Sequence, residues 1–201
     1  KKKKRDNDIT FEHINELVKN QDNKCVYSGV ELVWKNKFGM YQGTIDRIDS
    51  TKGHIINNCQ LVTIPINRFK SNLSANDFNE LIVLIKSNYY IKNNINKDIK
   101  YIKNMNSKEK KKIAALMCGI KNRELERMRE KSNEELTLGD VLLDFDTNFI
   151  DNLMKKQNGC CNITNVPLTW KTSSLDMASI DRIDSNKNYC KENIQIILWH
   201  V

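Results

Sequence analysis

The feature that most constrains this chain is a segment that occurs twice. Residues 43–61 read GTIDRIDSTKGHIINNCQL, and residues 178–196 read ASIDRIDSNKNYCKENIQI. In both copies an Asn and a Gln follow the acidic motif at the same distance, and a Cys, a Leu and a Trp precede it. Internal similarity of this length predicts two copies of one structural unit within the chain.

The size of the chain agrees with two small units. Its 201 residues have room for one ordinary domain or two small ones, and an apolar content of 39% supports modest cores. No apolar run approaches the roughly 20 residues of a membrane helix, and KKKKRDND lacks the apolar segment of a secretory signal. We therefore expect an intracellular protein that is not Sec-exported and has no membrane partner. The first residue is not Met, so we also expect an excerpt of a longer protein.

The six cysteines do not follow a metal-binding or disulfide pattern. The sequence contains no C-x-x-C pair and has few thiols for its size. We expect reduced cysteines that act mostly as small buried apolar residues. The adjacent pair Cys160 and Cys161 could be half of a zinc site, but its partners are missing, so structural zinc is not expected.

The formal net charge of +8 is concentrated in two segments. Residues 1–5 read KKKKR, and residues 107–131 hold nine Lys or Arg against four Glu, whereas the repeated units are not basic. Such segments favour an acidic partner, and nucleic acid would be held largely by the attraction of its phosphates to the tail and the middle segment. The alternative is that the Lys runs only keep the protein in solution.

Residue patterns in the first copy predict the order helix, strand, loop, strand, helix. We expect a helix from about residue 10 to 20, a strand up to Ile48, a polar turn, and a second strand from about 59 to 64. Pro65 suits the first turn of the helix that follows. A short amphipathic helix also precedes the second copy.

Two longer helices are predicted between the copies. Ser74 and Asp77 resemble a capping box, and the apolar residues after them recur at helical spacing, which indicates a core-facing stripe. That stripe is Phe78, Leu81, Ile82, Ile85 and Tyr89. The Asn- and Lys-rich stretch 92–106 is typical of a linker. A long charged helix should begin at Ser107, with one apolar face formed by Ile113, Leu116 and Ile120.

Three basic residues of this charged helix share another face, because they are spaced at i, i+4 and i+8. They are the predicted nucleic-acid contacts Arg123, Arg127 and Lys131. The expected organisation is a basic tail (1–9), a first unit with its following helix (10–94), a basic helical linker (95–135) and a second unit that is incomplete at its end (136–201).

Polar residues of the first copy suit phosphodiester hydrolysis. This reaction needs positive charge at the phosphate and a group that deprotonates the attacking water. Mg²⁺ and Mn²⁺ take oxygen ligands, and Mg²⁺ keeps several waters, so one carboxylate and one amide oxygen can be sufficient. Asp46 at the end of the first strand and Asn67 on the following helix could converge on such an ion, and Arg47 could hold a phosphate.

The first copy also matches, in order, the pattern C-x-x-[ST]-G, [ST]-[IL]-D-R-I-D-S-x-K-G-[YH], N-x-Q-[LW]-V and N-x-x-K, from Cys25 to Lys70. In this it resembles the HNH nucleases, also called ββα-metal or His-Me finger nucleases. The resemblance covers about residues 10–75 and again 146–201. It implies an α+β fold of two tandem ββα-metal modules joined by a helical basic linker, and one divalent metal held by Asp46 and Asn67.

The same resemblance implies roles for further residues. Asn58 would brace the hairpin loop, and Lys70 would lie near the phosphate. In the second copy the matching residues are Asp181, as metal ligand, with Arg182 and Asn193. If that copy ends at Val201 it has a single metal ligand and is a poor catalyst. If the chain continues, an Asn is expected next.

The departure from the family pattern concerns the general base. Most HNH nucleases have a His directly after the metal-binding Asp, whereas this chain has Arg47, and a guanidinium does not act as a base in a protein. The proton would then pass to His54, Tyr41, Tyr27 or a metal-bound hydroxide. A lone His in such a loop is more often a hydrogen-bonding residue than a base.

These observations predict a metal-dependent endonuclease of restriction or homing type that hydrolyses DNA with Mg²⁺ or Mn²⁺. Double-stranded DNA is the favoured partner, RNA stays open, and so does the oligomeric state. The alternative is a catalytically degenerate HNH-fold protein that binds nucleic acid, such as a structural component of a ribonucleoprotein; a groove-binding role like that of a transcription factor is a third. The plainest alternative is a strand that ends in a turn capped by Asp49, which does not explain two matched copies.

Overall fold

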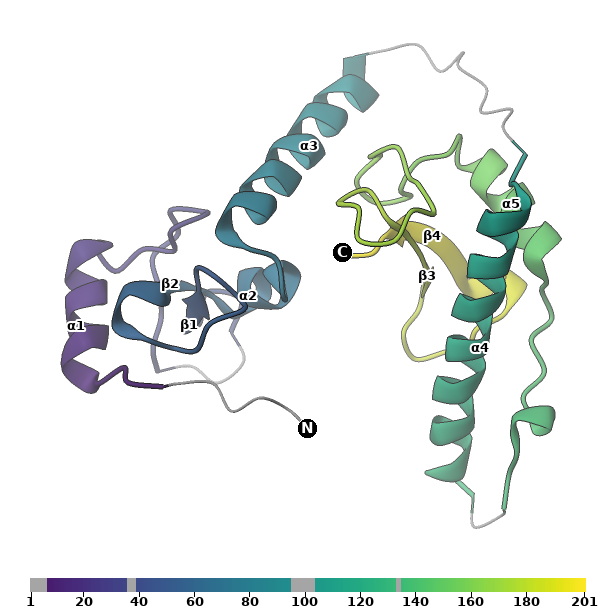
Figure 1. The fold of residues 1–201 in the computed structure, drawn as a ribbon, viewed down its shortest axis with the longest axis horizontal. Helices are drawn as coiled ribbons and strands as arrows, with labels where there is room; N and C mark the ends of the chain where they lie inside the picture. Colours follow the sequence, from purple (N-terminus) through teal and green to yellow (C-terminus); the bar gives the residue numbers. More distant parts are fainter. Residues whose placement is uncertain (1–6, 36–38, 95–103, 133–134) are drawn as a thin grey trace. The chain divides into compact units, whose positions relative to one another are not determined.

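The computed structural model describes residues 7–35, 39–94, 104–132 and 135–201. In these residues the fold is mixed α+β, with five α-helices and two two-stranded antiparallel sheets (Figure 1). The chain divides into two compact units, residues 1–82 and 83–199, and this division falls within a helix. None of the described helices combines the length and the hydropathy that crossing a membrane requires.

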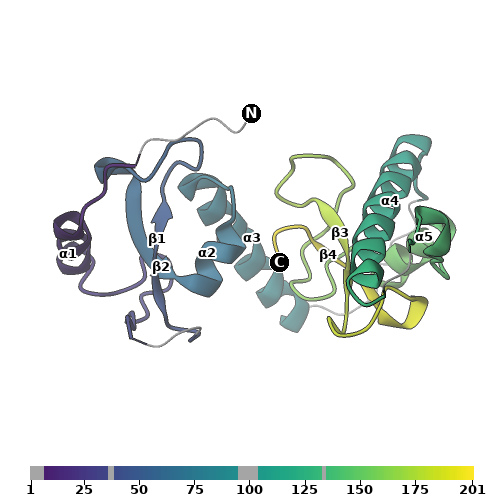
Figure 2. The same cartoon turned by 90° about the horizontal axis from the view of Figure 1, so that it is seen from below.

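The first unit is built around a β-hairpin. Strand β1 (Gly43–Arg47) pairs with β2 (Cys59–Thr63), and the register sets Asp46 opposite Gln60. Helix α1 (Phe11–Asn20) precedes the hairpin and α2 (Ile64–Lys70) follows it directly. The hairpin lies between these two helices in both views (Figures 1 and 2).

Local sequence signals explain where these elements begin and end. Thr10 caps α1 by accepting a hydrogen bond from the backbone N–H of His13, whose side chain in turn bonds the Thr10 N–H. Pro65 lies in the first turn of α2, where its missing N–H has no helical partner to lose. Ser71, at a φ of 52°, ends the helix. The predicted helices near 10–20 and at Pro65 and the two predicted strands are therefore confirmed.

The core of the first unit forms between α1 and the hairpin. Its buried centre is Cys25, Leu32, Leu61 and Val62, and Leu17 and Val18 of α1 pack against it. This supports the expectation that Cys25 acts as a small apolar residue. Ile66 of α2 packs against the same cluster, so this core holds both helices to the hairpin.

Helix α3 (Ala75–Asn94) begins at the predicted capping pair, since the Ser74 hydroxyl accepts from the Asp77 N–H at 3.1 Å. Of the expected apolar stripe, Phe78 and Leu81 are buried and Ile82 and Ile85 are partly buried, whereas the side chain of Tyr89 lies outside the described residues. The helix continues to Asn94, into the stretch expected to be a linker. Residues 95–103 of that stretch lie outside the described part of the chain.

The second unit contains α4 (Ser107–Arg129), a short 3₁₀ turn (Leu138–Asp140), α5 (Thr147–Lys156), and a hairpin of β3 (Ala178–Arg182) and β4 (Ile194–Leu198). The charged helix predicted from Ser107 is thus confirmed. It packs beside α5, with Ile113 and Ile120 buried (Figure 1). Lys112 bonds the carbonyl oxygen of Trp170, so α4 is attached to the body of this unit.

The two hairpins repeat the same hydrogen bonds. Gln21, after α1, donates to the Leu61 carbonyl and accepts from the Leu61 N–H, both at 2.9 Å. Gln157, after α5, makes the same pair of bonds with Ile196, at 2.7 and 2.9 Å. Gln21 lies four residues before Cys25 and Gln157 four residues before Cys161, so the two side chains occupy matching positions and satisfy one backbone N–H and one C=O of each hairpin.

Candidate functional site

A small polar cavity of about 170 Å³ lies in the first unit, where the end of β1 meets α2. It combines one carboxylate, one amide, one imidazole and two cationic side chains with two hydroxyls. The residues that line it are Ile45, Asp46, Arg47, Ser50, His54, Asn67, Lys70 and Ser71. Four of them were predicted as site residues of the first copy: Asp46, Arg47, Asn67 and Lys70; His54 was one of three possible bases.

Asp46 is buried, and both of its carboxylate oxygens have protein partners. Oδ1 lies 3.1 Å from the Lys70 Nζ, and Oδ2 accepts a hydrogen bond from the Gln60 Nε2 at 2.8 Å. The ion pair is almost closed to solvent, since the side chain of Lys70 is 0% exposed and that of Asp46 4%. A buried pair of this kind fixes the carboxylate firmly, because either charge alone would be costly to bury.

Lys70 comes from the last turn of α2 and reaches across to β1. Besides Asp46, its Nζ bonds the carbonyl oxygen of Arg47 at 2.7 Å. The resemblance implied a lysine near the phosphate; the structure shows a buried lysine that lines the cavity and forms an ion pair with a carboxylate. The pairing could not be predicted from the spacing of Lys70 alone, because it depends on how α2 packs on the hairpin.

Asn67 lies one helical turn before Lys70 on α2, so both side chains face the same cavity. Its Nδ2 donates to the Ile45 carbonyl oxygen at 3.4 Å. Among the described residues no donor contacts the Asn67 Oδ1, which leaves this oxygen as an acceptor or a metal ligand. The structure thus brings the predicted pair of oxygen-bearing residues, Asp46 and Asn67, to one cavity.

Arg47 braces the loop between the strands. Its Nη1 donates to the carbonyl oxygens of Ser50 and Lys52, at 2.8 and 3.1 Å. The guanidinium has five N–H groups, so others stay available to a ligand in the cavity that Arg47 lines. Its observed contacts are structural, and a phosphate contact would be an additional one.

Asn58, in the short 3₁₀ turn directly before β2, closes the same loop. Its side chain accepts from the Asp49 N–H at 2.8 Å and donates to the carbonyl oxygens of Asp49 and Gly53 at 3.0 and 2.9 Å. These bonds match the expectation that Asn58 braces the hairpin. Asn58 is not among the residues that line the cavity.

The three side chains predicted as possible bases occupy different surroundings. His54 lines the cavity, whereas neither Tyr27 nor Tyr41 does. Tyr41 is 53% exposed in the loop before β1. Tyr27 receives a hydrogen bond from the Gln60 Nε2 at 2.8 Å, and burial raises the pKa of its phenol, which makes it a poor proton acceptor near neutral pH. Position therefore favours His54.

Gln60 was not among the predicted site residues, although it touches both Asp46 and Tyr27. The signal in the sequence was its recurrence as Gln195. Gln195 donates to Asp181 in the second unit, at a longer 3.5 Å. Because the pairing register of each hairpin sets Gln opposite Asp, both copies use it to orient the carboxylate.

The second unit reproduces the loop but not the ion pair. The Arg182 Nη1 donates to the carbonyl oxygens of Ser185 and Lys187, and Asn193 bonds Asp184 and Asn188 as Asn58 bonds Asp49 and Gly53. Asp181 is partly exposed, and no described Lys or Arg forms an ion pair with it. Arg182 also lies over the Tyr189 ring, 5.3 Å from its centroid.

The three predicted phosphate contacts on and after α4 differ in their surroundings. Arg123 and Lys131 are exposed, whereas Arg127 is partly buried and its Nη1 lies 3.1 Å from the Glu124 Oε1. An arginine that already has a carboxylate partner attracts a phosphate less. We therefore expect Arg127 to contribute less to nucleic-acid binding than Arg123 and Lys131.

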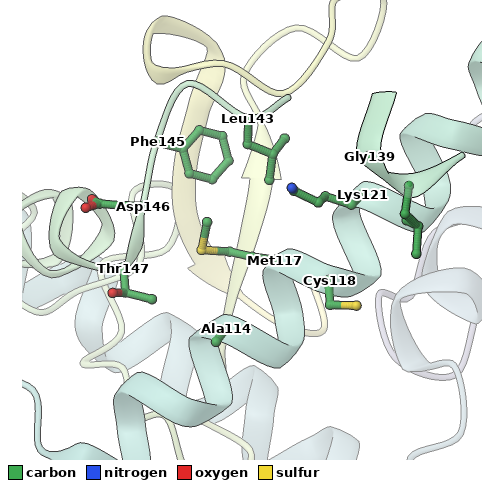
Figure 3. A pocket seen from close by; sticks show the side chains of 10 residues that line it. Ala114, Met117, Cys118, Lys121, Gly139, Leu143, Phe145, Asp146 and Thr147 are labelled. Atoms are coloured by element: carbon green, nitrogen blue, oxygen red, sulfur yellow. The ribbon is translucent and has the colours of Figure 1, made fainter. Parts of the chain in front are cut away.

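A larger cavity of about 560 Å³ lies in the second unit, along α4 and the start of α5 (Figure 3). Its lining includes apolar side chains, among them Met117, Leu143 and Phe145, with Lys121 and Asp146 also present. None of the predicted site residues lines it. Volume alone would favour this cavity, but the smaller one contains the cluster of chemically useful groups.

The described residues contain no cluster of three or more His, Cys, Asp or Glu side chains that could hold a metal. The small cavity instead has the carboxylate of Asp46, the amide of Asn67 and the imidazole of His54 in its lining. No protein-family model, no curated protein and no solved structure matches the chain.

Proposed function

We propose that this protein is a metal-dependent endonuclease of the HNH type, which hydrolyses phosphodiester bonds of DNA at the small cavity of the first unit. One observation carries the proposal: Asp46 and Asn67, from β1 and α2, line one small polar cavity together with His54, Arg47 and Lys70. The finer description of the fold, two tandem ββα-metal modules, is part of the same proposal.

The donor set of the cavity fits Mg²⁺ or Mn²⁺. A carboxylate has about four lone-pair sites, and only two of those of Asp46 have partners, while the Asn67 Oδ1 accepts from no described residue. A hard cation of this kind prefers oxygen ligands and keeps several waters, so two protein ligands can be enough. Bound there, it would supply the positive charge that phosphodiester hydrolysis needs.

The other residues of the cavity take roles that follow from their contacts. Lys70 and Gln60 hold the Asp46 carboxylate in one orientation. His54 is the proton acceptor for the attacking water, because it is the predicted base that lines the cavity. Arg47 offers its remaining N–H groups to the phosphate while it braces the loop.

The basic segments provide the binding surface for nucleic acid. The exposed cations Arg123 and Lys131, together with the five basic residues at the start of the chain, would neutralise phosphates and make binding sensitive to salt. Contacts to phosphates position a protein without selecting a sequence. Double-stranded DNA remains the proposed substrate.

A second function is favoured by two specific observations. The buried Lys70 already neutralises Asp46, and Arg47 replaces the His of most HNH enzymes. Both features suit a catalytically degenerate HNH-fold protein that binds nucleic acid without cutting it, such as a structural component of a ribonucleoprotein. The two functions differ in whether a divalent metal leads to cleavage.

Incubation of supercoiled plasmid with Mg²⁺, Mn²⁺ or EDTA distinguishes them. We expect nicking or cutting with either metal and none with EDTA. Asp46→Asn and Asn67→Ala should each lower the rate by about 100-fold or more, because each loses a group that positions transition-state charge. Circular dichroism should show that both variants are folded.

The matched control is Asp49→Asn, which changes another carboxylate of the motif, one outside the cavity, and keeps a side chain able to cap the turn. It should cut at the wild-type rate. Undiminished cutting by Asp46→Asn would point to the second unit or to a contaminant, and Asp181→Asn in the same background decides which. Plasmid binding without cutting under every condition would support the degenerate protein.

A further inference from the structure

The protein itself places a cation beside the Asp46 carboxylate. The Lys70 Nζ lies 3.1 Å from the Asp46 Oδ1, and the lysine is held a second time by the Arg47 carbonyl oxygen at 2.7 Å. Its side chain is 0% exposed, so no direct path to solvent is open to it. Lys70 is therefore a fixed positive charge in the wall of the cavity.

We infer that Lys70 is a positioning residue that lowers the affinity of Asp46 and Asn67 for a divalent cation, so that the cation is held firmly only together with a phosphodiester. The inference rests on the proposed function, because it concerns the same cavity. It adds that metal and nucleic acid bind to the cavity cooperatively, whereas metal alone binds weakly.

The charges that line the cavity carry this inference. Asp46 contributes one negative charge, which Lys70 balances, and Arg47 adds a further positive charge. A divalent cation would therefore enter a site that is already positive. Repulsion between charges a few ångströms apart is strong where water is excluded. A phosphodiester group that enters with the cation brings the negative charge that restores the balance.

In an alternative arrangement Lys70 would leave Asp46 when a metal binds. The hydrogen bond from Lys70 to the Arg47 carbonyl oxygen disfavours this arrangement. A lysine released from Asp46 would stay near the Arg47 carbonyl oxygen, and so would remain close to the cation. Burying the ammonium group without a carboxylate partner is also costly. The geometry therefore keeps the two cations in competition for one carboxylate.

Titration with Mn²⁺, followed by the loss of the electron paramagnetic resonance signal of free Mn²⁺, tests the inference without any need for catalysis. Lys70→Met removes the charge and keeps most of the volume. We expect this variant to bind Mn²⁺ at least about tenfold more tightly than the wild-type protein, because a like charge next to the site is gone. Lys70→Gln, which keeps a hydrogen-bond donor, should show the same direction and replaces Lys70→Met if that variant does not fold.

Two controls assign the effect. Lys52→Met removes a lysine from the neighbouring loop, where it pairs with Asp49 and is 62% exposed, and should leave Mn²⁺ affinity unchanged. Asp46→Asn combined with Lys70→Met should abolish the gain. Thermal unfolding tests whether metal and DNA bind cooperatively. Ca²⁺ and a short DNA duplex together should raise the melting temperature of the wild-type protein by more than the sum of their separate effects.

The outcomes separate this inference from the nuclease proposal. If wild-type protein nicks plasmid with Mn²⁺ but Lys70→Met and Lys70→Gln bind Mn²⁺ no more tightly than wild type, the inference is wrong and the nuclease remains. If the lysine variants gain Mn²⁺ affinity while wild-type protein never cuts, the inference holds and the nuclease proposal fails. If wild-type protein never cuts plasmid and neither lysine variant binds Mn²⁺ more tightly than wild type, both are wrong.

Discussion

Asp46 and Lys70, 24 residues apart in the chain, form an ion pair that is closed to solvent, with 3.1 Å between Oδ1 and Nζ. The pair joins β1 to the last turn of α2, and it lies in the wall of the cavity that also contains Asn67 and His54. A buried pair therefore links the stability of this hairpin and helix to the geometry of the candidate site.

The first prediction concerns the stability that depends on this pair. Lys70→Ala leaves the Asp46 charge buried without its cation and should lower the free energy of unfolding by about 3–5 kcal/mol. Lys52→Ala breaks the exposed pair with Asp49 and should lower it by less than about 1 kcal/mol. Urea unfolding followed by circular dichroism measures both. Similar losses of unfolding free energy for the two variants would show that the buried pair stabilises the protein no more than the exposed pair does.

The second prediction concerns the loop braces that both copies share. Asn58→Ala removes three hydrogen bonds and leaves buried backbone groups without partners, so we expect a loss of about 2–3 kcal/mol of unfolding free energy. Asn193→Ala should cause a similar loss in the second unit. The adjacent Asn57 is exposed, and Asn57→Ala should change stability by less than about 0.5 kcal/mol.

The third prediction is a dependence of stability on pH that comes from the two turns. Hydrogen bonds from the Thr51 hydroxyl and N–H lower the pKa of Asp49, and the Asn186 N–H lowers that of Asp184. A carboxyl with a lowered pKa in the folded state contributes stability above its unfolded pKa of about 3.9, and this is lost as the pH falls through the folded value.

The unfolding free energy should therefore fall as the pH is lowered from about 4 to 2. The double variant Asp49→Asn and Asp184→Asn should show a shallower fall over the same range, because Asn can cap both turns without titrating. Urea unfolding at a series of pH values measures the slope. Equal slopes for the variant and the wild-type protein would assign the acid sensitivity to other carboxyls.

The fourth prediction tests the proton acceptor of the proposed nuclease. His54→Ala should lower the cleavage rate by about 100-fold or more, as expected when a general base is removed. Tyr41→Phe should leave the rate unchanged, because Tyr41 does not line the cavity. Rates are compared under single-turnover conditions with enzyme in excess. A cleavage rate of His54→Ala equal to that of the wild-type protein would leave a metal-bound hydroxide or another group as the acceptor.

The fifth prediction concerns the cations on and after α4. Arg123→Gln should weaken DNA binding and reduce the slope of log affinity against log salt by about 0.9, the value for one lost phosphate contact. Arg127→Gln should reduce the slope less, because Arg127 is already paired with Glu124 at 3.1 Å. Fluorescence anisotropy with a labelled duplex at several salt concentrations measures the slopes. An equal effect of the two variants would mean that the ion pair opens when DNA binds.

The amino-acid sequence by itself determined the local structure and the repeat. Turn residues, the position of Pro65, the cap before Phe78 and the periodicity after Ser107 predicted the elements that the structure contains, because each is set by interactions between residues close in the chain. The repeat likewise predicted two units with matching loops, and the bonds of Asn58 and Asn193 now explain it physically.

Only the tertiary structure decided which side chains meet. The motif suggested Asp46 and Asn67, but it did not show that Lys70 is buried against Asp46, that Arg47 holds the loop, or that His54 lines the cavity. These relationships depend on how α2 packs against the hairpin, and packing is a property of surfaces that come together only in the folded chain. The sequence alone therefore predicts which residue types the site contains, while the fold determines which of them are paired.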